Sequence, residues 1–184
     1  MIRIERTPIK DLLVIHPQVF RDERGYFLES FNEREFHEAT GGDHHFVQDN
    51  ESRSNSGVLR GLHYQEMPFA QGKLVRVLAG SVLDVCVDLR PDSPTFGEHF
   101  KRVLDEKERA MIFVPPQFAH GFLVLEERTV FAYKCTAYYN PDAERSIVWN
   151  DEDLGIDWGT SSPILSEKDR QGASFRSIMN AAAR

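Results

Sequence analysis

The sequence predicts a mainly β protein, an antiparallel barrel or sandwich with a few short helices. The first indication is alternation: residues 81–89 (SVLDVCVDL) place Leu83 and Val85 on one face and Asp84 on the other. The second is punctuation, because turn residues separate the apolar segments, as in 90–94 (RPDSP). The third is the scarcity of helical periodicity. Half-apolar strands of this kind bury their apolar faces in a closed or double antiparallel sheet.

Comparable strand patterns recur along the chain, each next to a turn signal. They cover residues 27–31, 57–65, 74–78, 111–114, 121–125, 129–138 and 146–149. The helical signal is confined to two places. Asn32, followed three residues later by Glu35, resembles a capping box for a short helix that ends near Gly41 and Gly42. A second short helix is expected in the C-terminal tail.

Length and charge narrow the class of protein. A chain of 184 residues predicts one domain over residues 1–184. The net charge of −7 argues against nucleic acid as a partner, so an anionic ligand must be small and held by local cations. No apolar run approaches the roughly 18 residues of a membrane span, and we expect no membrane association and a cytoplasmic location. Cys86 and Cys135 are expected to be core thiols.

Three cationic or titratable side chains occur within fourteen positions of two strand-like segments. Arg60 and His63 lie in GVLRGLHYQ (57–65), and Lys73 opens the next segment. Burying such groups without partners costs on the order of several kcal/mol each. The pattern therefore predicts a proton-transfer site that handles a negatively charged substrate.

His63 is the candidate base of this site. The alternative is a histidine that is hydrogen-bonded inside the core. Lys73 on the neighbouring strand, and Asp169 as a carboxylate that orients the imidazole, favour the catalytic interpretation. Arg60 and His63 are three residues apart and would face opposite ways in a regular strand, so we predict a β-bulge at Gly61.

Tyr133 and Tyr139 share parity along the segment 129–138 and its continuation, so both can point into one cavity. One tyrosine could donate a proton, and the other could stack on a flat base. The alternative is an aromatic core strand, since thirteen Phe and five Tyr make aromatic residues common in this chain.

Two histidines on neighbouring strands of a small barrel raise the question of a metal site. His120 is the second, but the first motif is His63-Tyr64-Gln65, and an amide is a poor substitute for an imidazole ligand. We expect His120 to pair with a carboxylate such as Asp84, and we predict no metal and no cofactor. His44 and His45 lie in a polar loop and are expected to be solvated.

The chain resembles the dTDP-4-dehydrorhamnose 3,5-epimerase family, a branch of the cupin barrels, over roughly residues 1–170. The segments that carry the resemblance are 20–29 (FRDERGYFLE), 46–52 (FVQDNES), 57–65, 71–76 (QGKLVR), 87–90, 93–97 (SPTFG), 118–122 (FAHGF), 133–134, 138–139, 147–151 (IVWND) and 165–169 (LSEKD). Their shared order makes chance implausible. The resemblance implies a cupin-type jelly roll and a cofactor-free epimerase that inverts C3 and C5 of dTDP-4-dehydro-6-deoxy-D-glucose in dTDP-L-rhamnose synthesis.

The resemblance also implies residue roles. The residue matching His63 is the proton acceptor, that matching Tyr133 the proton donor, and that matching Tyr139 stacks on thymine. Lys73 is suited to stabilise an enolate oxygen. The positions that match substrate-contacting residues are Arg24, Glu29, Gln48, Asp49, Asn50, Arg60, Lys73, His120, Glu144 and Lys168. Family members are homodimers with sheets shared across the interface, so Arg24 and Glu29 are expected to serve the partner's site.

The residues are compatible with rival functions. Within the same class, a relative that inverts only C3 or only C5 would keep the same base. From other classes, a metal-dependent cupin would need a complete ligand set, and a sugar-nucleotide-binding cupin without activity would not need His63, Tyr133 and Lys73 together.

A departure from the family pattern is Gln117, where many members have glycine in a turn. The tail 170–184 has no motif.

Overall fold

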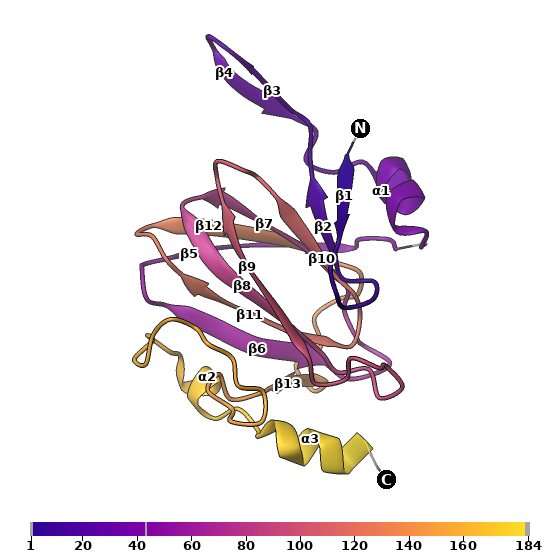
Figure 1. The fold of residues 1–184 in the computed structure, drawn as a ribbon, viewed down its shortest axis with the longest axis vertical. Coiled ribbons are helices and arrows are strands. Elements are labelled where there is room, and N and C mark those ends of the chain that lie inside the picture. The colour runs from indigo at the N-terminus through magenta and orange to yellow at the C-terminus, as the bar shows by residue number, and fades with distance from the viewer. Residues whose placement is uncertain (1, 43, 183–184) are drawn as a thin grey trace.

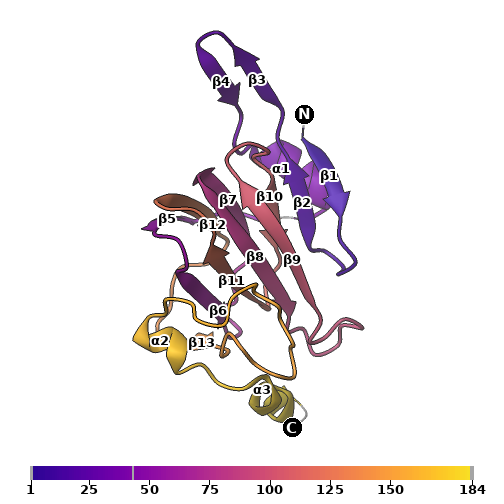
Figure 2. The same cartoon turned by 60° about the vertical axis from the view of Figure 1, so that its left-hand side comes forward.

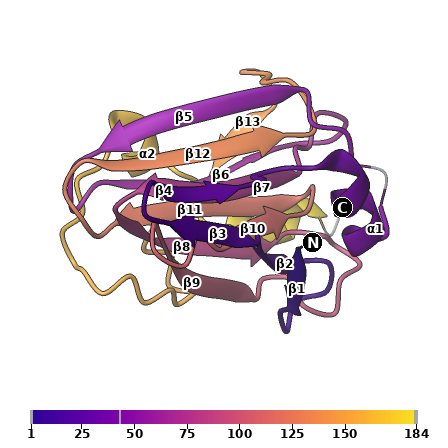
Figure 3. The same cartoon turned by 90° about the horizontal axis from the view of Figure 1, so that it is seen from above.

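The protein is built on two antiparallel β-sheets packed face to face, as Figures 1 and 3 show. The computed structural model describes residues 2–42 and 44–182. One sheet of the described residues has six strands, in the order β1 (Arg3–Arg6), β2 (Leu13–His16), β10 (Met111–Val114), β7 (Lys73–Ala79), β12 (Thr129–Cys135) and β5 (Gln48–Ser54). The other has five, in the order β13 (Glu144–Ser146), β6 (Leu59–Gln65), β11 (Phe118–Val124), β8 (Ser81–Asp88) and β9 (His99–Asp105). The prediction of a mainly antiparallel β fold is confirmed.

The main core lies between the two sheets. Val75, Ile112 and Phe131 from the six-stranded sheet pack against Val82 and Phe122 from the five-stranded sheet. The outer face of β8 packs elsewhere, with Val85 and Val87 in a second cluster. The alternation along residues 81–88 therefore divides the side chains of β8 between two hydrophobic clusters. Cys86 and Cys135 are buried free thiols, as expected.

Helix α1 (Glu33–Thr40) covers part of the outer face of the six-stranded sheet. The Asn32 side chain accepts a hydrogen bond from the backbone N–H of Glu35, and Gly41 closes the helix in the left-handed conformation. Phe36 is buried against Phe113 of β10. The predicted cap, helix and C-terminal glycine are all confirmed.

The C-terminal segment covers the outer face of the five-stranded sheet (Figures 1 and 2). It contains α2 (Glu167–Arg170) and α3 (Phe175–Ala182), where the sequence predicts one short helix. Trp158 and Phe175 pack on the sheet, and the Asp151 carboxylate accepts a hydrogen bond from the backbone N–H of Phe175. The tail therefore closes a hydrophobic cluster, a structural role that its sequence does not reveal.

Some strand boundaries differ from those expected. The segment 27–31 is a strand only to Leu28, in β4 (Gly25–Leu28), which pairs with β3 (Val19–Asp22). The two form a hairpin that extends away from the sheets (Figures 1 and 2). The strand expected over 129–138 ends at Cys135. Gln117 has a φ of 65°, in the left-handed region that glycine adopts without strain. No helix of the described part of the chain is long and apolar enough to cross a membrane.

Gly61 forms the predicted bulge in β6. His63 pairs with His120 and Arg60 with Phe122, so Gly61 and its successor lie opposite the single residue Gly121. A Cβ on Gly61 would lie 2.4 Å from the Cα of Gly121, and its φ is +134°. The bulge lets Arg60 and His63 line the same cavity.

Replacing Gly61 with alanine is expected to destabilise the fold by about 2–5 kcal/mol, because overpacking against a backbone atom adds to backbone strain. Urea unfolding followed by circular dichroism measures this loss. Gly159→Ala is the matched control, since Gly159 also has a positive φ, +74°, but a Cβ added there would meet no atom within 4 Å. An equal loss in both variants would contradict the argument from close approach.

Candidate active site

A cavity of about 510 Å³ opens between the two sheets, beside α2. Its lining includes side chains from β5, β6, β7, β11, β12 and β13. Most of the predicted site residues meet there: Gln48, Asn50, Arg60, His63, Lys73, His120, Tyr133, Tyr139, Glu144, Lys168 and Asp169. The cavity is therefore the candidate active site.

His63 is held by a buried carboxylate. Its Nε2 atom lies 2.6 Å from Oδ1 of Asp169, whose exposure is only 3%. Burial alone raises the pKa of Asp169, but hydrogen bonds from His63 and Ser166 outweigh it, and the pKa lies below its ordinary value. Asp169 is thus a carboxylate that accepts from one ring nitrogen, which orients the other for proton transfer.

Ser166 is a residue that sequence reasoning missed. Its hydroxyl donates to Oδ2 of Asp169 at 2.6 Å, and Oγ of Ser166 accepts a hydrogen bond from the backbone N–H of Asp169 as the N-cap of α2. The backbone N–H of Gly61 adds a longer contact, 3.4 Å, to Oδ1. The serine three residues before the aspartate was the signal in the sequence, since Ser-x-x-Asp is a helix start. These bonds fix the carboxylate that orients His63.

Lys73 and Tyr133 come from the opposite wall. Residue Tyr133 of β12 pairs with Val75 of β7, and Lys73 pairs with Cys135, so parity puts both functional side chains on the inner face. Burial is the main cause of the pKa changes: it lowers the pKa of the Lys73 ammonium and raises that of the Tyr133 phenol. At neutral pH the phenol keeps its proton.

The rim of the cavity holds further charged groups. Glu144 forms an ion pair with Lys168 and accepts a hydrogen bond from the Tyr139 hydroxyl at 2.7 Å. Burial raises the pKa of Glu144, but these two bonds dominate together and lower it. Arg60 donates to the Ser54 hydroxyl at 3.2 Å. Arg60, Lys73 and Lys168 give this part of an acidic protein a local set of cations.

Three predicted site residues do not line the cavity. Asp49 lies between Gln48 and Asn50 on β5, so its side chain has the opposite parity and pairs with Lys134 at 2.9 Å. Arg24, at the tip of the β3–β4 hairpin, is exposed and pairs with Asp22. Glu29 follows β4 and lies beside the cluster around Phe36. Within the described chain, the β3–β4 hairpin contributes no residue to the cavity lining.

His120 has the carboxylate partner that its sequence context predicts, with Nε2 lying 2.8 Å from Oδ2 of Asp84. Cys86 completes a group of possible metal ligands with these two residues, and burial raises the pKa of its thiol well above the usual value. Gln65 is engaged elsewhere: its amide bonds to the backbone of residues 69, 138 and 140. Each of the two cavity histidines thus has a carboxylate partner, Asp169 for His63 and Asp84 for His120.

The expectation that His44 and His45 are solvated is wrong for His44, whereas His45 is 62% exposed but also has a side-chain partner. The ring of His44 packs against Phe113, with 4.8 Å between centroids, and Nδ1 of His45 lies 2.9 Å from Oε1 of Glu33. The sequence around the two histidines does not indicate these contacts. Phe113 is distant in the sequence, and Glu33 is on the preceding helix.

Comparison with known proteins gives consistent results. The sequence model described as dTDP-4-dehydrorhamnose 3,5-epimerase matches residues 6–177. A protein of that name from Pseudomonas aeruginosa is 52% identical over 175 residues, covering 95% of this chain and 96% of the relative.

Two solved structures are close in sequence and shape. The dTDP-4-dehydrorhamnose 3,5-epimerase of Elizabethkingia anophelis is 50% identical with a TM-score of 0.92, covering 96% of this chain and 97% of the other. The dTDP-6-deoxy-D-glucose-3,5-epimerase of Legionella pneumophila, in complex with dTDP-4-keto-L-rhamnose, is 46% identical with a TM-score of 0.94, covering 99% and 97%.

Proposed function

The chain belongs to the dTDP-4-dehydrorhamnose 3,5-epimerase family, and we propose that its cavity inverts C3 and C5 of dTDP-4-dehydro-6-deoxy-D-glucose. The product is dTDP-4-dehydro-β-L-rhamnose. The observation that carries this proposal is the single cavity in which His63, held by Asp169, meets Tyr133 and Lys73 from the other sheet.

The chemistry follows from the ketone at C4. This group acidifies the protons on both C3 and C5, and removal of either proton gives an enolate. Inversion then requires a base on one face of the sugar and an acid on the other. His63 on β6 and Tyr133 on β12 belong to opposite sheets, and both line the cavity. Positioned proton transfer contributes about 10²–10⁴-fold to the rate.

We propose that Lys73 stabilises the enolate oxygen. Its side chain is 8% exposed, and a cation in such a dry site interacts strongly with a developing negative charge. Tyr133 remains protonated at neutral pH because burial raises its pKa, which suits a proton donor. His120, paired with Asp84, faces the same cavity and contacts the sugar in this proposal.

The nucleotide end of the substrate would lie at the rim. Arg60 and Lys168 supply cations for the diphosphate, and guanidinium geometry suits phosphate oxygens. Tyr139, which is 53% exposed, offers a ring for stacking on thymine. Gln48 and Asn50 add amide groups on the adjacent wall. Substrate binding would break the bonds that Glu144 makes to Lys168 and Tyr139, and bonds to the substrate would replace them.

We further propose that the enzyme is a homodimer. The β3–β4 hairpin extends from the sheets and exposes Phe20, Tyr26 and Phe27. Exposed aromatic side chains on a projecting arm are typical of an interface. In a dimer the hairpin would reach the second copy, where Arg24 and Glu29 would contact substrate in the partner's cavity. A cytoplasmic location also stays a prediction.

The test is deuterium exchange. Purified protein is incubated with dTDP-4-dehydro-6-deoxyglucose in D₂O, and the C3 and C5 protons are followed by NMR. Exchange at both carbons, with a product that a rhamnose-forming reductase accepts, supports the double epimerase. Exchange at one carbon alone identifies a relative that inverts a single centre, and no exchange at either carbon refutes the enzymatic assignment.

Two additions to this experiment, a chelator and a measurement of dTDP affinity, separate the rivals from other classes. A metal-dependent cupin would lose activity on treatment with a chelator, whereas the proton transfer proposed here needs none of the chelated ions. A cupin that only binds sugar nucleotides would retain dTDP affinity without any exchange.

A further inference from the structure

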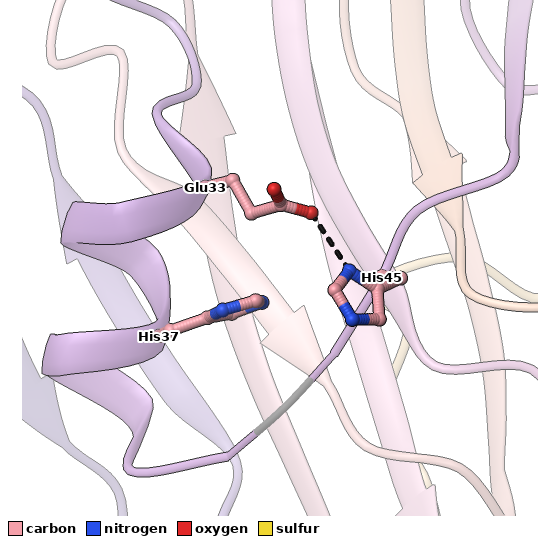
Figure 4. A group of neighbouring side chains, drawn as sticks. All are labelled: Glu33, His37 and His45. Atoms are coloured by element: carbon pink, nitrogen blue, oxygen red, sulfur yellow. Dashed lines mark hydrogen bonds and ion pairs between the residues drawn. The ribbon is translucent and has the colours of Figure 1, made fainter.

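We propose that Glu33, His37 and His45 form a binding site for a first-row divalent metal ion such as Zn²⁺, separate from the active-site cavity. Glu33 and His37 lie one turn apart on α1, and His45 is in the segment between α1 and β5 (Figure 4). One ligand atom from each residue lies within 4.8 Å of the other two. The site departs from the expectation that this protein holds no metal.

The distances are close to those of a bound ion. Ligand atoms about 2.1 Å from a tetrahedral zinc ion lie about 3.4 Å from each other. The three side chains therefore need to close by no more than roughly 1.4 Å, which rotation about side-chain bonds supplies. Figure 4 shows all three pointing toward one another.

Existing contacts already bring the rings together. Nδ1 of His45 lies 2.9 Å from Oε1 of Glu33, and an ion would replace the proton that this pair shares. The rings of His37 and His45 are 5.3 Å apart between centroids. Nε2 of His37 lies 3.0 Å from the carbonyl oxygen of His44, which holds the His37 ring against the segment that carries His45.

Helix α1 holds two of the three ligands in fixed positions. Asn32 caps its first turn, and Phe36, between the two ligands in sequence, is buried against Phe113. Residues four apart on a helix lie on the same face, so the buried side of α1 fixes the direction of Glu33 and His37. A ligand pair on an anchored helix loses little conformational entropy on binding.

The donor set selects the class of metal. Two imidazoles and one carboxylate suit Zn²⁺, Ni²⁺, Co²⁺ or Cu²⁺, whereas Mg²⁺ and Ca²⁺ prefer oxygen ligands. Three protein ligands leave a position for water. Because β5 begins at Gln48, three residues after His45, the ion would tie α1 to the segment that leads into the cavity wall. We therefore infer a stabilising role for the ion.

Isothermal titration of the full chain without a polyhistidine tag, after treatment with a chelator, tests the site. We expect one Zn²⁺ per chain with a micromolar Kd, and no binding of Mg²⁺ under the same conditions. Saturating zinc should raise Tm by about 5–10 °C. His45→Ala and Glu33→Gln should each weaken zinc binding at least about tenfold and remove the rise in Tm.

His16→Ala is the matched control, because His16 also lies 2.9 Å from a glutamate oxygen, that of Glu5, but belongs to neither group of three ligands in the described chain. Cobalt provides a second readout, since its visible absorption bands report direct ligation and should be lost in His45→Ala but not in His16→Ala. His45 is exposed, so its replacement leaves the fold intact. Absence of zinc binding to the wild-type chain, or wild-type affinity for zinc in both ligand variants, would overturn the proposal.

Discussion

Replacing His63 with alanine is expected to abolish deuterium exchange at both C3 and C5. A single base serves both epimerisations in the proposed mechanism, so its loss removes both enolates rather than one. Each step should slow by about 10²–10⁴-fold, the usual contribution of a positioned general base. NMR in D₂O, with substrate in excess and the wild-type chain in parallel, measures both exchange rates.

Asp169→Asn provides a graded comparison for this prediction. An amide keeps the shape of the side chain but loses the charge that accepts the 2.6 Å bond from His63. Exchange should therefore fall at both carbons, by less than in His63→Ala, and by the same factor at each. Circular dichroism checks that both variants fold. Exchange that persists at either carbon in His63→Ala would show that a second base exists.

The central strands could be predicted from the sequence, because a strand with one buried face alternates apolar and polar residues. Strand β10 matches the predicted 111–114, and β8 matches 81–89 to within one residue. The bulge at Gly61 was also accessible, because Arg60 and His63 could share a cavity only if the parity changed between them. Local rules of parity and capping were sufficient in these cases.

Other features depended on information that no local pattern contains. Strand β9 carries Lys101 and Arg102 in adjacent positions and lies at a sheet edge, so its alternation is weak. The strand pattern over 27–31 gave no sign that this segment belongs to a projecting hairpin, in which Phe27 is 69% exposed. Asp49 matched the family pattern, but only the strand register places its side chain outside the chain's own cavity.

Some of the site residues could also be predicted from the sequence, whereas other contacts in the site depend on the fold. His63, Tyr133 and Lys73 could be chosen by residue type and segment, whereas the contact of the Gly61 backbone N–H with Asp169 required the position of α2 against β6. Likewise, Glu33, His37 and His45 meet only because His45, which follows α1 in the sequence, lies beside the helix. Sequence identifies reactive groups on regular elements more readily than partners brought together by loops.

Tyr133→Phe is expected to separate proton removal from inversion. His63 can still form the enolate and return solvent deuterium to the face from which it took the proton, so deuterium should enter without inversion. Net formation of the epimerised product should fall by about 10²-fold or more, because the opposite face has lost its donor. NMR of the recovered sugar nucleotide gives both the deuterium content and the configuration at each carbon.

Tyr138→Phe is the matched control, since Tyr138 is 71% exposed and absent from the cavity lining, yet lies five residues away on the same segment. It should leave inversion and exchange unchanged. The phenol of Tyr133 differs in its environment, because burial raises its pKa and keeps its proton in place at neutral pH. If Tyr133→Phe blocks exchange as completely as His63→Ala, the phenol takes part in enolate formation, and the division of roles between base and acid is wrong.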